Sequence, residues 1–166
     1  MARKSIQATA FHEAGHAAAM LHFGYRAQKA SIVGTEDYLG VVRHCAKELE
    51  FDADSDRSPD TVNKIEELAQ ICFSGPIAQR KKFPKSQWRI AGDLDFTQAA
   101  HLLSYLSWSD AKADKLHMDL IWRRTELLVD LLWPTIEALA ESLLVSKTLD
   151  DNDLREIYDR PLGKRA

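Results

Sequence analysis

Three residues near the start of the chain have the types and spacing needed for metal-assisted hydrolysis. His12, Glu13 and His16 form an H-E-x-x-H pattern. On a helix the two histidines lie about 40° apart around the axis, so both imidazoles can reach one metal ion. Glu13 lies to one side of the two histidines around the helix. There its carboxylate can take a proton from a metal-bound water, whose pKa the metal lowers to about 7. The motif predicts a Zn²⁺ site with Glu13 as the general base, as in zinc peptidases.

The surrounding residues favour a metal site. From Ala8 to Phe23 the sequence is apolar or small on almost every side, which is typical of a buried helix. Burying two histidines and a glutamate without partners is unfavourable, and a metal ion is the simplest partner for all three. The alternative interpretation is a pair of structural core histidines whose hydrogen bonds are satisfied by other groups.

A catalytic zinc usually has three protein ligands and one open position, so a further ligand is required. His22 follows His16 at the spacing of the last metzincin histidine, but Ala19 stands where that pattern has a glycine. If the helix continues, His22 points away from the metal. Glu66 or Glu67 on a later helix is a second candidate, in the manner of thermolysin-like enzymes.

Asp95 is the third candidate. It precedes a stripe of apolar residues by one helical turn and lies on the same face, which indicates that its carboxylate points toward the core and needs a counter-charge. That stripe consists of Ala99, Leu102, Leu103 and Leu106. Favourable placement near a helix N-terminus is the competing explanation for Asp95. Asp93 lies on another side and is predicted to be an N-cap.

The remaining pattern predicts a mainly α fold with one small β-hairpin, formed as a single domain over residues 1–166. Ser31 to Val33 and Leu39 to Val42 are β-branched runs suited to the hairpin. Helices are expected at about 5–23, from Ser58 with an interruption or kink at Gly75-Pro76, and at about 94–107, 110–132, 134–146 and after 148. An acidic segment over 46–58 and a basic, aromatic segment over 80–89 are predicted to be solvated loops.

The composition limits the function classes. With 166 residues, 45% apolar and 28% charged, the chain resembles an ordinary globular protein, and a net charge of -3 gives no support for binding nucleic acid or an anionic membrane. Cys45 and Cys72 form no C-x-x-C pair, so they are expected to be thiols in a reducing compartment. Since no signal peptide or membrane-spanning run is apparent, we expect a cytoplasmic protein.

Five segments in the same order resemble the peptidase domain of the FtsH family of ATP-dependent zinc proteases, over about residues 9 to 158. They are Phe-His-Glu-Ala-Gly-His-Ala, Lys29-Ala-Ser-Ile-Val with Leu39-Gly-Val-Val, Phe73-Ser-Gly-Pro-Ile-Ala, Gly92-Asp-Leu-Asp-Phe-Thr-Gln-Ala, and the tail from Leu139 to Asp150. The resemblance implies a helical zinc-peptidase domain in which His12, His16 and Asp95 bind zinc and Glu13 is the base. It also implies that the strand over 39–42 holds an extended peptide.

The chain also departs from that family. These 166 residues contain no G-x-x-x-x-G-K-[ST] loop and no apolar run that would predict the family's membrane anchor, and Gly75-Pro76 and Gln79-Arg80 stand where the family has glycine, arginine and paired glutamates. ATP dependence and a hexameric state are therefore not expected from the resemblance. The expected partners are peptides or unfolded proteins, delivered by a separate unfoldase or adaptor where needed, and a homo-oligomer stays open. The alternatives are a catalytically inactive interaction or regulatory module, and a zinc hydrolase with a non-peptide substrate.

Overall fold

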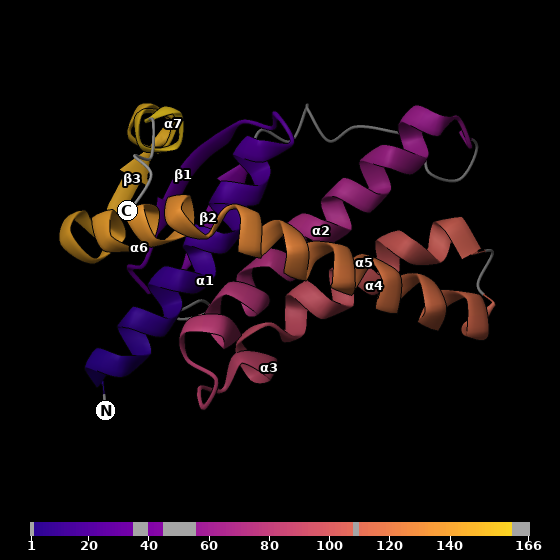
Figure 1. Ribbon diagram of the computed structural model, residues 1–166, viewed down its shortest axis with the longest axis horizontal. Helices are drawn as coiled ribbons and strands as arrows, with labels where there is room; N and C mark the ends of the chain where they lie inside the picture. The colour runs from indigo at the N-terminus through magenta and orange to yellow at the C-terminus, as the bar shows by residue number, and fades with distance from the viewer. Residues whose placement is uncertain (1, 35–39, 45–55, 108–109, 161–166) are drawn as a thin grey trace.

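The computed structural model describes residues 2–34, 40–44, 56–107 and 110–160, and its described part consists mainly of helices with one small sheet. The prediction of a mainly helical fold with a small β element is confirmed. Figure 1 shows the elements, which are α1 (Ala2–His22), β1 (Ala27–Ser31), β2 (Val41–His44), α2 (Pro59–Lys82), α3 (Trp88–Ala91), α4 (Asp93–Ser107), α5 (Ala111–Leu131), α6 (Trp133–Ser146), β3 (Thr148–Asp150) and α7 (Asp151–Asp159).

The sheet is antiparallel, with strand order β2-β1-β3. The predicted hairpin is confirmed by the pairing of β1 with β2, in which Ala30 lies opposite Val42, although Leu39 lies outside the described residues. The third strand was not predicted. Lys147 ends α6 in the left-handed conformation, with φ of 65°, and turns the chain so that Leu149 pairs with Ala30.

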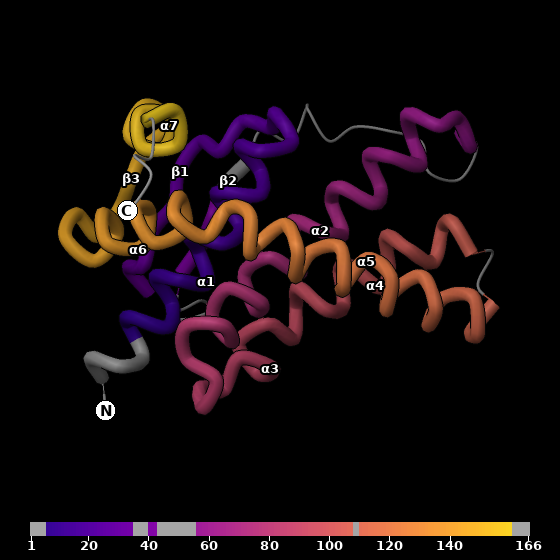
Figure 2. Tube along the Cα trace, viewed as in Figure 1, coloured from indigo at the N-terminus to yellow at the C-terminus, as the bar shows by residue number. Residues whose placement is uncertain are grey.

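The metal-binding motif lies on α1, which packs most extensively against α2 and α6. In the view of Figure 2 the trace of α6 crosses that of α1. Four of its alanines, Ala10, Ala14, Ala17 and Ala18, are fully buried. Small side chains let neighbouring helices approach closely, and burial on every side is what the sequence predicted for this segment.

Helix α2 begins as predicted, because the Ser58 hydroxyl accepts a hydrogen bond from the Thr61 amide and caps its N-terminus. The expected interruption at Gly75-Pro76 is wrong, since α2 runs unbroken through both residues. Proline removes one intrahelical donor. All residues from 73 to 79 are buried, and this packing holds the helix together across the proline.

The basic segment over 80–89 is not a solvated loop throughout, because Arg80 lies within α2 and Trp88 begins α3. The Arg80 guanidinium lies 5.4 Å from the Trp88 ring centre and 5.2 Å from that of Trp122, and it forms an ion pair with Glu126. Asp93 begins α4 directly after Gly92 rather than preceding it as an N-cap. In the described part of the chain, no helix combines the length and apolarity needed to cross a membrane.

Candidate metal centre

The structure brings together three of the predicted site residues, His12 and His16 from α1 and Asp95 from the first turn of α4. One Asp95 oxygen lies 3.1 Å from His12 Nε2, and the other lies 3.4 Å from His16 Nε2. The two Nε2 atoms are 3.1 Å apart. Among the described residues this is the one group of histidine, cysteine and carboxylate side chains close enough to share a metal ion.

The other nitrogen of each ring fixes how the histidines are oriented. His12 Nδ1 lies 3.0 Å from the Gln79 side-chain oxygen, and His16 Nδ1 lies 2.8 Å from the Ile71 carbonyl oxygen. Both oxygens can only accept a hydrogen bond, so each Nδ1 carries a proton and donates it. In the neutral rings, both Nε2 lone pairs therefore point toward Asp95.

With both rings neutral, the two Nε2 lone pairs and the two oxygens of the Asp95 carboxylate face one another, and either a proton or a metal ion among them would offset their repulsion. The tetrahedral coordination of zinc, with bonds of about 2.0–2.1 Å, separates neighbouring ligand atoms by about 3.3 Å. The two Nε2 atoms are 3.1 Å apart, and they lie 3.1 and 3.4 Å from the two different Asp95 oxygens, separations that are close to that value. Two histidines and one aspartate, each buried or nearly so, could hold a metal ion, and they are the ligand types of zinc sites that keep one open position.

The proton affinities of the site show the same demand for positive charge. Burial opposes a charge on His16, but Asp95 attracts and hydrogen-bonds the imidazolium, and with Glu13 and the Ile71 carbonyl it raises the pKa of His16 to about 9. Burial likewise favours a neutral Asp95, but the two histidines lower its pKa well below the ordinary range. A proton on His16 and a divalent cation are competing ways to meet this demand.

Glu13 lies beside the three candidate ligands without joining them. Its side chain is buried, and this burial raises its pKa, while His12 and His16 lower the pKa in part. The backbone leading into β2 passes close to the Glu13 carboxylate, as the space at Gly40 shows. A Cβ atom added there would lie 2.6 Å from Glu13 Oε1. A buried carboxyl with a raised pKa, beside two histidines and a cleft, has the surroundings expected of a general base.

A glycine on α2 makes room for His16. A Cβ atom added at Gly75 would lie 2.3 Å from His16 Nε2, far inside van der Waals contact. The α2 backbone therefore comes up against the imidazole, and the neighbouring Ile71 carbonyl accepts its Nδ1 proton. This contact explains why a glycine stands in the middle of a buried helix.

The candidate metal centre opens into a cleft of about 1760 Å³. Gly40, Val41 and Val42 form one side of it, and the segment from Phe83 to Gln87, together with α4, contributes others. Among the described residues β2 pairs only with β1, which leaves the other edge of β2 unpaired. The cleft is larger than the roughly 300–1,000 Å³ of a typical small-molecule pocket.

The other two predictions for the third ligand fall elsewhere. His22 is exposed at the end of α1, as expected. Glu66 accepts hydrogen bonds from His117 and Arg124, and Glu67 accepts one from the Tyr25 hydroxyl. These partners lie away from the candidate metal centre and account for both glutamates.

Sequence reasoning did not identify what Gln79, Ile71 and Gly75 do. The departure from the family pattern marked Gln79 and Gly75 as unusual positions, but only the fold shows that they contact the histidines. A backbone carbonyl such as that of Ile71 leaves no signal in a sequence. No protein-family model matches the chain, and no curated protein matches it in sequence.

Proposed function

We propose that this protein is a zinc-dependent peptidase that hydrolyses peptide bonds in extended or unfolded chains. The observation that carries the proposal is the convergence of two histidine lone pairs and one carboxylate at zinc-like separations, with both Nδ1 atoms committed to other acceptors. The resemblance of five ordered segments to the FtsH peptidase domain also supports it, since three of those segments lie outside the candidate ligands.

In this proposal His12, His16 and Asp95 hold Zn²⁺, and their second hydrogen bonds keep the rings in place. When bound, the ion supplies Lewis acidity, which makes water a nucleophile near neutral pH and polarises the scissile carbonyl. Glu13 takes the proton of the attacking water and delivers it to the departing amine. Burial of Glu13 raises its pKa, so the protonated carboxyl is a competent acid for the second step.

The cleft favours a peptide over a small ester or amide. Its volume of about 1760 Å³ exceeds that of a small ligand. Val41 and Val42 of β2 line the cleft, and one edge of β2 has no pairing partner among the described residues, so we infer that an extended peptide pairs with this edge with little demand on its own sequence. A folded protein has few such segments to offer, so the proposed substrates are short peptides, unfolded chains, or chains presented by an unfoldase or adaptor.

The proposal includes a cytoplasmic location. Cys72 is a free thiol, which fits a reducing compartment, while Cys45 lies outside the described residues.

The decisive experiment measures zinc content and cleavage of an unstructured, fluorescently labelled casein in four proteins. We expect wild type to bind about one zinc per chain and to cleave the casein. Glu13→Gln should keep the zinc and lose about 10²–10⁴-fold in rate, as removal of a general base does. Asp95→Ala should lose zinc and activity together. Asp93→Ala is the matched control, because Asp93 lies in the same helical turn and lines the cleft without touching either histidine.

Each other outcome points to a different function. A Glu13→Gln protein as active as wild type would exclude the proposed base. Wild type that binds zinc but cleaves neither casein nor short peptides would favour the inactive interaction module. Cleavage of small esters or amides alone would favour a zinc hydrolase of another class. Failure to bind zinc after reconstitution would make the histidines structural.

A further inference from the structure

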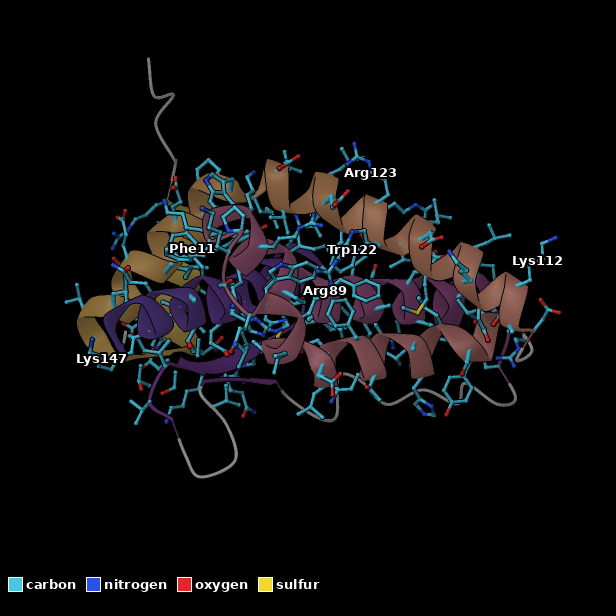
Figure 3. All side chains as sticks on the ribbon, turned by 90° about the horizontal axis from the view of Figure 1, so that it is seen from below. Phe11, Arg89, Lys112, Trp122, Arg123 and Lys147 are labelled. Carbon is cyan, nitrogen blue, oxygen red and sulfur yellow. The ribbon has the colours of Figure 1, made fainter. Side chains whose placement is uncertain are left out.

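Four leucines form an exposed stripe along α5. Leu116, Leu120, Leu127 and Leu131 are 63%, 47%, 55% and 69% exposed. At about 100° per residue they fall within about 60° of the helix circumference. Figure 3 shows Arg123 and Lys112 on the outer side of the same helix, whereas Trp122 points into the body of the molecule. Contiguous apolar surface of this kind usually marks a site of association.

We propose that this stripe is the contact surface of a homodimer, in which the α5 helices of two copies pack antiparallel about a two-fold axis. This inference does not depend on the proposed catalytic function. A two-fold axis passing between residues 121 and 122 brings Leu116 of one copy opposite Leu127 of the other. The two copies of Leu120 then lie near the axis, within about one helical turn of each other.

The charges on α5 select this arrangement. Lys112 and Asp130 lie on the same side of the stripe, near opposite ends of the helix, and both are exposed. In the antiparallel register, Lys112 of one copy falls within about one residue of Asp130 of the other. In a parallel dimer Lys112 and Asp130 would lie far apart along the helix and on opposite flanks of the contact, so this attraction between opposite charges would be absent.

A second pair of charges agrees with the same register. Asp119 and Arg123 also lie on that side of the stripe, each with 66% of its side chain exposed. Asp119 of one copy falls within about one residue of Arg123 of the other. An axis moved to lie between residues 123 and 124 would align all four leucines but would set Asp119 against Asp130. The register with matched charges is therefore the one proposed.

The existing ion pairs of these residues leave them free to exchange partners. Within one chain Asp130 pairs with Lys81, Asp119 with Lys115, and Arg123 with Glu126. Such exposed pairs contribute roughly 0–1 kcal/mol each, so new partners across the dimer can share or replace them. An interface built on one helix per chain lies at the small end of specific interfaces, and we expect a Kd in the micromolar range, on the order of 1–50 μM.

The first test is sedimentation velocity from about 1 to about 200 μM, a range that brackets a micromolar Kd. We expect wild type to pass from monomer to dimer, and the Leu120→Glu/Leu127→Glu variant to stay monomeric with unchanged helical circular dichroism. Val145→Glu is the control, because Val145 is an equally apolar residue, 83% exposed, on α6 outside the stripe. A monomer at every concentration, or a dimer that survives the double glutamate variant, would overturn the proposal. So would a monomeric wild type that binds phosphatidylcholine vesicles through the stripe.

A charge exchange tests the register. Lys112→Glu and Asp130→Lys alone should each weaken the dimer by about 3–10-fold, and the double variant should recover most of that loss. The two positions lie at opposite ends of α5 within one chain, and the double variant does not restore the pair with Lys81. Recovery therefore reports a contact between copies. Failure to recover would overturn the antiparallel register.

Discussion

The Gln79 side-chain oxygen lies 3.0 Å from His12 Nδ1, while the other ring nitrogen of His12, Nε2, lies next to Asp95. The same amide donates to the Ser86 hydroxyl, which in turn donates to the Phe83 carbonyl. A carboxylate could accept from His12 but could not donate to Ser86 while ionised. The amide therefore ties the histidine to the 83–87 segment that forms part of the cleft wall.

This contact predicts a loss of metal affinity in Gln79→Leu. The leucine keeps the approximate volume but leaves His12 without its acceptor, and loss of such a partner typically weakens metal binding about 10–100-fold. Zinc affinity measured by competition with a chromogenic chelator checks this. Gln98→Leu is the control, since Gln98 lines the same cleft but contacts Cys72 rather than a histidine. Equal affinities for the two variants would contradict the prediction.

Gly75→Ala should disrupt the centre by crowding. The new methyl group would lie 2.3 Å from His16 Nε2, so either the ring or α2 must move. We expect a loss of about 1–3 kcal/mol in unfolding free energy and at least about tenfold in zinc affinity. Gly92→Ala introduces a methyl 2.8 Å from Pro76 Cβ and serves as the comparison. It should cost similar stability yet keep zinc, and a Gly75→Ala protein that does the same would refute the argument.

Stability of the metal-free protein should depend on pH through His16. Its pKa rises from the ordinary 6.5 to about 9 in the folded protein, held there by Asp95 against the opposing effect of burial. Because the folded pKa is the higher one, this stabilisation is complete below about pH 6.5 and is lost as pH rises toward 9.

We therefore expect the unfolding free energy of chelator-treated protein to fall by on the order of 2 kcal/mol between pH 6.5 and 9. Urea unfolding across that range is the measurement. His16→Gln, measured beside it, should lack this part of the pH dependence. A flat profile for chelator-treated wild type would show that His16 carries no proton in the folded state.

The Cys72 thiol should react slowly. Burial, and to a lesser extent the nearby Asp95 carboxylate, raises its pKa to about 12. At pH 8 its thiolate fraction is then on the order of 10³-fold below that of an ordinary cysteine. Alkylation of a Cys45→Ser protein by iodoacetamide, followed by mass spectrometry, measures the rate. The same protein in urea gives the unhindered rate, and comparable rates in the two conditions would disprove the shift.

Local patterns predicted much of this structure because they depend on near neighbours in the sequence. The Ser58 cap needs only the residues that follow it, and the turn of Asp95 toward the core follows from the apolar stripe after it. The pairing of β3 with β1 could not be predicted in this way, since a strand of three residues forms only where a neighbouring strand is positioned to pair with it. The continuity of α2 through Pro76 likewise depends on packing against helices distant in sequence.

The same distinction, between features set within one helix and features set by packing, applies to the residues of the candidate site. His12, Glu13 and His16 are recognisable because a helix alone sets their geometry. The role of Gln79 depends on how α2 crosses α1, and the room that Gly75 gives His16 depends on the same crossing. Sequence spacing carries no record of that crossing.

Asp95 lies on α4, far along the chain from the two histidines on α1. An ion bound by all three would act as a reversible crosslink that closes a long loop of the unfolded chain, as a disulfide does. Because α4 packs mainly against α2 and α5, such an ion would be its main direct link to α1, and chelation would remove that link.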